Sequence, residues 1–226
     1  MIRHEAPLVR EVFLGNPDRL PHVEDAKDRR IIRAEAAAAL AMATAYKTLR
    51  RDSLTRLGNG LALEDAFEEL ITNSEVNAAL LYIDLKNFKR VNDGDGHQKG
   101  DDYLKTFGQR LAEFDLRNKE GLYPREEVFH LHGDEYVVLI HTNYKENGNR
   151  DPNLTPQGYV EGVMNRIRGV AASIADDNGL SYVEKYGVTA NIGAAFYEPG
   201  DSLEAMKARA DMAMYADKLA MGDGDR

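Results

Sequence analysis

The sequence predicts an α+β domain with a mostly antiparallel central sheet flanked by helices, preceded by one long N-terminal helix. Two observations support this class. Short aliphatic runs and stretches of helical periodicity follow one another in the order strand, helices, hairpin, helix, strand, helix. Residues Glu24 to Arg51 contain no proline or glycine and are rich in alanine, which favours an uninterrupted helix.

Length and composition exclude several classes of protein. The 226 residues allow one domain of roughly 150 residues plus an extension. The net charge of −9 argues against general binding to nucleic acid or anionic lipid, so an anionic ligand needs local cations or metals. The chain has no cysteine, no apolar run near the roughly 20 residues of a membrane span, and no apolar stretch typical of a signal peptide. We therefore expect a cytoplasmic protein.

Three segments are expected along the chain. Residues 1–23 contain Pro7, Pro17 and Pro21 and are interpreted as an irregular arm. Residues 24–51 form a helical stalk, and residues 52–226 form the main domain. The apolar spacing of the stalk is too loose for a clean heptad repeat, so pairing of two subunits and packing on its own domain both stay open.

Within the main domain, apolar spacing predicts each element in turn. Leu63, Phe67, Leu70 and Ile71 are spaced as one face of a helix. Residues 78–84 are typical of a buried strand, which places Asp84 at a strand end.

The second half of the domain follows the same logic. A helical stripe includes Tyr103, Phe107 and Leu111, and residues 127–131 and 136–141 are expected to be two strands joined by a tight turn. The remaining predictions are a polar loop at 142–156, a helix with Val160, Val163, Met164, Ile167, Val170 and Ile174 inward, a strand at 188–194 and a last helix from about Ser202.

Two acidic clusters stand next to predicted strands: one begins at Asp84, and the other is His132-Gly133-Asp134-Glu135-Tyr136. Carboxylate oxygens suit hard Mg²⁺, which leaves coordination positions for water and phosphate. Two such ions can activate an attacking hydroxyl and stabilise a leaving phosphate oxygen, and Lys89 could neutralise phosphate charge. A single carboxylate in such a place is more often a solvated turn residue, so the hypothesis depends on the combination.

Four segments together resemble the GGDEF family, the diguanylate cyclases: 52–59 (DSLTRLGN), 84–101 (DLKNFKRVNDGDGHQKGD), 132–136 (HGDEY) and 210–218 (ADMAMYADK). The resemblance extends from Asp52 to Gly222. It implies a nucleotidyl-cyclase-like fold with a ferredoxin-like core. It also implies condensation of two GTP molecules into cyclic di-GMP and two pyrophosphates, in a homodimer formed through the N-terminal helix and the catalytic domain, each subunit holding one GTP.

The resemblance also implies roles for particular residues. Asp84 and Asp134 would bind Mg²⁺ (or Mn²⁺) with the carbonyl of Leu85, and Asp134 would take the proton from the attacking 3′-hydroxyl. Glu135 would be a further ligand and catalytic residue, and Lys89 the transition-state lysine. The implied substrate contacts are Phe88, Asn92, His97, Asp101, Gly133 and Lys218.

Asp101 carries the nucleotide preference in this interpretation. Asn92 and Asp101 match the positions that hydrogen-bond guanine. A carboxylate can accept from the N1 hydrogen and exocyclic amine of guanine, but it mismatches the acceptor N1 of adenine. GTP is therefore favoured over ATP.

Several positions depart from the family pattern. His132 replaces the first glycine of the signature and could obstruct GTP, act as an unusual ligand, or point away. The other departures are His130 for arginine, Lys86 for a second acid, Gly60 for arginine, and no phosphate-binding arginine near Gly222. Tyr123 and Glu126 occupy the Arg-x-x-Asp positions of the family's inhibitory product site, so product inhibition there is not expected.

Three hypotheses follow from the pattern and its departures. The first is a Mg²⁺-dependent diguanylate cyclase. The second is a catalytically degenerate domain that binds GTP or cyclic di-GMP as a sensor. The third is a dimerisation scaffold in which the site is vestigial.

Overall fold

The computed structural model describes residues 26–72, 77–116, 125–141 and 155–220. The chain divides into two compact units, 1–49 and 50–226. In the first unit the structure describes helix α2 (Ala26–Leu49), within the range predicted for the stalk. The predicted arm at 1–23 lies outside the described residues, and a pairing role for α2 stays a prediction.

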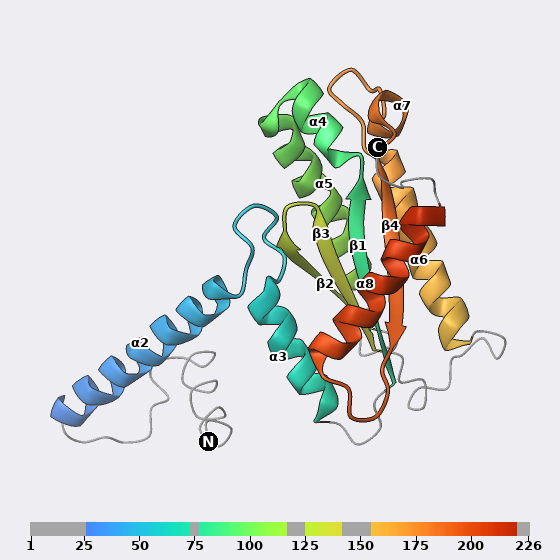
Figure 1. The fold of residues 1–226 in the computed structure, drawn as a ribbon. Helices are drawn as coiled ribbons and strands as arrows, with labels where there is room; N and C mark the ends of the chain where they lie inside the picture. Colours follow the sequence, from blue (N-terminus) through green and yellow to red (C-terminus); the bar gives the residue numbers. More distant parts are fainter. Residues whose placement is uncertain (1–25, 73–76, 117–124, 142–154, 221–226) are drawn as a thin grey trace. The chain divides into compact units, whose positions relative to one another are not determined.

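The second unit is built on a four-stranded sheet with the order β2-β3-β1-β4 (Figure 1). The strands are β1 (Ala78–Lys86), β2 (Arg125–His132), β3 (Glu135–His141) and β4 (Thr189–Phe196). All three neighbouring pairs are antiparallel, which confirms the predicted class. Strands β1 and β3 occupy the centre, and β1 begins where predicted but extends two residues beyond Asp84.

Helices cover both faces of the sheet (Figure 1). They are α3 (Gly60–Ile71), α4 (Phe88–Asp95), α5 (His97–Leu116), α6 (Pro156–Ser173), α7 (Tyr182–Tyr186) and α8 (Leu203–Ala220). Apolar residues of α3 and α8 pack with Leu80 and Tyr82 of β1, whereas those of α4 to α7 pack with Leu81 and Ile83. Because side chains alternate along a strand, even-numbered positions of β1 face α3 and α8. Asp84 therefore lies on the α8 face.

Local signals explain where the helices begin. The side chain of Asn59 accepts from the amide of Ala62 and caps α3, and Thr155 caps α6 ahead of Pro156 at its first turn. Helix α7 begins with a capping box in which Ser181 and Glu184 bond each other's main chain.

Two expectations about the elements are corrected. Ile71 is 42% exposed, because it follows Leu70 by about 100° around the helix and so leaves the buried face. The sequence prediction also contained no helix at α7, which is only five residues long. Across the described ranges, no helix is both long and apolar enough to cross a bilayer.

Candidate active site

Three polar residues lie in a row across the centre of the sheet. Asp84 of β1 is the Cα partner of Glu135 on β3 and of Asn191 on β4. On β3 and β4 the odd-numbered neighbours Val137 and Ala195 belong to the core under α3 and α8. Strand alternation thus puts all three polar side chains on the α8 face.

Asp84 is held from two directions. Asn191 Nδ2 donates to Asp84 Oδ2 at 3.3 Å, and Lys218 Nζ, from α8, lies 3.5 Å from the same oxygen. The prediction that Asp84 ends its strand was wrong. It lies two residues inside β1 and is paired on both sides, so its main chain is fixed by the sheet.

Asp134 occupies the two-residue turn between β2 and β3, as predicted for the second acidic cluster. The preceding Gly133 has φ of +56°, a left-handed conformation that favours glycine. Burial raises the pKa of the Asp134 carboxyl, the negative charge of Asp84 raises it further, and Lys218 acts in the opposite direction. The structure therefore brings the two predicted metal-binding carboxylates into one electrostatic environment.

Glu135 is positioned by two neighbours that differ in burial. Tyr82 Oη donates to Glu135 Oε2 at 2.5 Å, and burial together with this carboxylate raises the pKa of Tyr82. His132 Nε2 lies 3.4 Å from the same oxygen, while the His132 side chain is 75% exposed. Of the three alternatives for His132, the contact with Glu135 argues against a side chain that simply points away.

His130 contacts the main chain of the turn that contains Gly133 and Asp134. Its buried ring lies with Nε2 2.9 Å from the carbonyl oxygen of Gly133, so Nε2 is the donor. Nδ1 lies 2.9 Å from Asp52 Oδ1 without hydrogen-bond alignment. Burial opposes ionisation of Asp52, but hydrogen bonds from Thr55 and the contact with His130 leave the Asp52 pKa lowered overall. The signature turn is thus joined to the turn that opens the domain.

The predicted guanine-contacting residues lie on α4 and α5. A Cβ atom at Gly100 would lie 1.9 Å from Asn92 Oδ1, so the Asn92 side chain packs directly against Gly100. Asp101 follows Gly100 on α5 and is half-buried. His97 is exposed at the first residue of α5.

Three further predicted site residues lie just after Asp84 in the chain. Lys89 is exposed on the first turn of α4, and within the described residues it makes no hydrogen bond or ion pair with Asp84 or Asp134. Phe88 is buried and packs on Tyr103, with ring centroids 6.0 Å apart. The side chain of Leu85 is also buried. Any contact of Phe88 or Leu85 with a ligand therefore falls to the main chain.

The donor set suits a hard cation that is shared with phosphate. Asp84 and Asp134 offer carboxylate oxygens, and Asn191 Oδ1 is buried without a hydrogen-bond partner in the described part of the chain. In the same ranges, no three His, Asp or Glu side chains form a ready metal centre. Mg²⁺ is usually held by one or two carboxylates plus substrate phosphates, so a ready all-protein cage is not required.

The sequence interpretation did not single out Tyr82 or Asn191. Asn191 had a signal, because it is a polar residue within an otherwise apolar strand. Tyr82 had a weaker signal, its spacing of two from Asp84.

Comparison with known proteins identifies the family of this chain. Residues 49–223 match the family described as "Diguanylate cyclase, GGDEF domain". The biofilm architecture maintenance protein MbaA of Vibrio cholerae is 30% identical over 173 residues, which are 75% of this chain and 20% of that protein. Diguanylate cyclase DgcS of Shewanella oneidensis is 26% identical over 174 residues, 75% of this chain and 49% of that one. The chain thus spans half or less of these relatives.

A solved structure supports the fold. The coiled coil and GGDEF domain of DgcB from Caulobacter crescentus, in complex with c-di-GMP, superposes with a TM-score of 0.64 at 20% identity. The match covers 87% of this chain and 96% of that one. From its sheet order, its paired carboxylates and its match over residues 49–223, this chain belongs to the GGDEF family.

Proposed function

We propose that this protein is a diguanylate cyclase, which condenses two GTP molecules into cyclic di-GMP and two pyrophosphates. One observation carries the proposal: Asp84, Asp134 and Lys218 share one environment at the sheet. Membership of the GGDEF family supports it, as does the name diguanylate cyclase given to relatives such as DgcS.

We assign to the residues the roles that the family resemblance implies, and the placement of Asp84, Asp134 and Lys218 supports this assignment. Asp134 accepts the proton of the 3′-hydroxyl of one GTP. The 3′-oxygen then bonds to the α-phosphorus of the other GTP, and pyrophosphate leaves. A second such step closes the ring. Asp84, Asp134, Glu135 and the Leu85 carbonyl would hold Mg²⁺ or Mn²⁺, which lowers the pKa of the hydroxyl and offsets phosphate charge. Lys218 and Lys89 would bind phosphate oxygens.

Substrate choice and assembly complete the proposal. Asn92 and Asp101 would hydrogen-bond guanine and exclude ATP, with His97 and Gly133 as further substrate contacts. Each subunit of a homodimer would hold one GTP, because the ring needs two nucleotides face to face. We propose that α2 and the catalytic domain both contribute to this dimer.

The experiment is incubation of the purified protein with GTP and Mg²⁺, with ATP in a parallel reaction, and mass identification of any cyclic dinucleotide. We expect cyclic di-GMP in the reaction with GTP and no cyclic dinucleotide in the reaction with ATP. The Asp134→Asn variant should form no cyclic di-GMP, because it lacks both the base and a metal ligand. Glu204→Gln removes an exposed carboxylate of α8 and serves as the control. Unchanged turnover in Asp134→Asn would contradict the mechanism.

A second candidate is a degenerate domain that binds GTP or cyclic di-GMP without turnover. The observation in its favour is His132, which replaces a small residue and contacts the proposed ligand Glu135. Turnover of the His132→Gly variant shows whether the histidine obstructs the nucleotide or takes part in the site. Turnover that rises in this variant identifies an obstruction, and turnover that falls shows that the histidine has been recruited to the site. Absence of any nucleotide affinity would favour a scaffold.

A further inference from the structure

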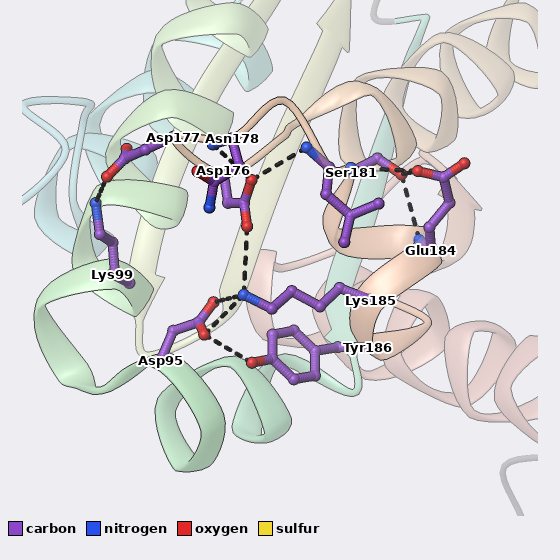
Figure 2. Close-up of polar contacts among 10 residues, drawn as sticks. Asp95, Lys99, Asp176, Asp177, Asn178, Ser181, Glu184, Lys185 and Tyr186 are labelled. Atoms are coloured by element: carbon purple, nitrogen blue, oxygen red, sulfur yellow. Dashed lines mark hydrogen bonds and ion pairs between the residues drawn. The ribbon is translucent and has the colours of Figure 1, made fainter.

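The segment from Asp176 to Gly187, which contains α7, contacts both helices that carry the predicted guanine-contacting residues. We call it the 176–187 segment. It is far in sequence from residues 87–101, yet the two lie side by side in the fold (Figure 2). The proposed function assigns no role to the 176–187 segment.

Lys185 makes the central contact. Its Nζ lies 2.8 Å from both carboxylate oxygens of Asp95, the last residue of α4, and 3.3 Å from Asp176 Oδ2 (Figure 2). Tyr186 Oη donates to Asp95 Oδ1 at 2.8 Å. Hydrogen bonds from Lys185 and Tyr186 lower the pKa of Asp95, so these contacts favour the ionised carboxylate.

Further contacts fix both ends of α4. The Tyr186 phenol packs so closely on Gly94 that a Cβ atom there would lie 2.3 Å from Oη. Before α4, Asn87 has φ of +62° and donates from Nδ2 to the carbonyl of Gly187 at 3.0 Å. Asparagine adopts the left-handed conformation more readily than most non-glycine residues, and the contact with Gly187 helps to hold Asn87 in it.

The start of α5 is fastened to the same segment. Lys99 Nζ lies 2.6 Å from Asp177 Oδ2, and the rings of Tyr103 and Tyr182 meet edge to face with centroids 5.3 Å apart. Gly100 and Asp101 lie between these two α5 residues. The contacts thus surround the point where Asn92 packs on α5.

The 176–187 segment has its own internal bonds. Asp176 Oδ1 accepts from the amides of Asn178 and Leu180, and the capping box of Ser181 and Glu184 begins α7 (Figure 2). These internal hydrogen bonds hold the 176–187 segment in one conformation. The segment can therefore fix the position of α4, which a loop without such bonds could not do.

We infer that Lys185 is a positioning residue for guanine recognition: by bridging Asp176 and Asp95 it fixes α4 and so sets where Asn92 lies relative to Asp101. This inference rests on the proposed function. It adds a determinant of base specificity that touches no nucleotide.

The test compares wild-type residues 1–226 with the Lys185→Met variant of the same chain, using GTP and inosine triphosphate (ITP), which lacks the exocyclic amine of guanine. We expect a two- to fivefold loss of kcat/KM for GTP, mainly through KM, as for loss of a partly exposed ion pair. The preference for GTP over ITP should fall with it, because the amine contact needs correct geometry. A loss of stability alone would not change that ratio.

Four variants control this experiment. Lys105→Met breaks a pair with Asp102 inside α5 and should leave the GTP to ITP ratio unchanged. Lys185→Arg keeps the charge and should retain most of the preference. Asp95→Asn should reproduce the loss, and the double variant with Lys185→Met should be no worse than either alone. An unchanged ratio in Lys185→Met overturns the inference.

Amide hydrogen exchange separates this inference from the proposed function. Residues 88–95 should exchange faster in Lys185→Met than in wild type or Lys105→Met, with no nucleotide present. Unchanged exchange there overturns the positioning role alone. If wild type does not turn GTP over, dissociation constants for GTP and ITP replace kcat/KM. A wild type that binds neither overturns the proposed function, and the specificity role falls with it.

Discussion

The buried amide of Asn191 donates a hydrogen bond to Asp84 but adds little to the stability of the fold. Its Nδ2 holds Asp84, but its Oδ1 is buried without a hydrogen-bond partner among the described residues. An unpaired buried acceptor destabilises by about 1–3 kcal/mol, which is as large as the gain from one hydrogen bond. Stability alone therefore does not account for this asparagine in the middle of an apolar strand.

We predict that Asn191→Ala separates function from stability. The free energy of unfolding should change by less than about 1 kcal/mol, because the lost bond is offset by loss of the unpaired oxygen. The Mg²⁺ concentration for half-maximal turnover should rise about tenfold, since Asp84 loses its orientation. Urea unfolding and a Mg²⁺ titration measure the two effects. Asn165→Ala, at an exposed position of α6, is the control. An unchanged Mg²⁺ requirement would contradict the prediction.

At the residue scale, site residues that belong to a sequence motif could be predicted. Residues that reach the site only through the pairing register of two strands could not. Asp84, Asp134 and Glu135 stand in recognisable clusters. Asn191 reaches Asp84 only because β1 and β4 pair in one register, and a shift of one residue would move it to the other face. Single-strand patterns contain no information about that pairing.

At the scale of the elements, the main chain of α8 packs directly on the main chain of β4 at Gly193. A Cβ atom there would lie 2.0 Å from the carbonyl oxygen of Ala210 and from the amide nitrogen of Met214. Neither main-chain atom can rotate away. The glycine therefore sets how closely α8, with Lys218, approaches the sheet.

Gly193→Ala should destabilise the protein by about 3 kcal/mol, because α8 must move away from the sheet to admit a methyl group. Urea unfolding measures the change. Gly162→Ala on α6, where an added Cβ atom would meet nothing within 4 Å apart from its own helix backbone, should instead stabilise slightly through helix propensity. Equal effects of the two substitutions would show that α8 does not pack this closely.

The turn that leads into α8 should respond to pH. Arg209 donates to both oxygens of Asp201, at 2.8 and 2.6 Å, and these bonds lower the Asp201 pKa below its unfolded value of about 3.9. The folded state thus favours the ionised form. The resulting stability is present above the unfolded pKa and is lost as pH falls through the folded pKa.

We predict that wild type exceeds Asp201→Asn in unfolding free energy by about 1 kcal/mol at pH 6, and that this excess disappears as pH falls below about 3.9. Urea unfolding of both proteins across this range measures the excess. An excess that stays constant with pH would contradict the role of ionised Asp201. Comparison with the variant cancels the response of the other carboxylates.

Periodicity predicted the long helices and all four strands, because their apolar faces are spaced regularly. It failed at α7, where five residues are too few for a repeat, although the Ser181 and Glu184 capping box was present in the sequence. It also failed at Ile71, an apolar residue one position beyond the buried stripe. Short elements and helix ends are decided by local bonds rather than by pattern.

At the scale of the whole molecule, the core belongs to the second unit. Every buried apolar side chain of the described ranges lies between Leu57 and Met214. The boundary between the two units falls at Leu49 and Arg50, close to the predicted domain start at Asp52. Removal of residues 1–49 thus removes none of the described core.

We predict that residues 50–226 fold by themselves with a Tm within about 4 °C of the full chain, as expected when less than about 1 kcal/mol is lost. Cyclase activity per subunit at low protein concentration should fall, because the proposed pairing of two subunits through α2 is lost. Thermal denaturation and sedimentation measure the two effects. A Tm lower by more than about 10 °C would instead indicate that the stalk packs on its own domain.

The contact between Asp84 and Lys218 joins residues 134 positions apart in the chain. During synthesis, β1 emerges from the ribosome long before α8, and contacts of such separation form late in folding. A nascent chain can therefore hold a partly ordered sheet while Asp84 still lacks its lysine. The proposed site becomes complete only when α8 docks, so a chain that is still being translated would not yet have the proposed cyclase activity.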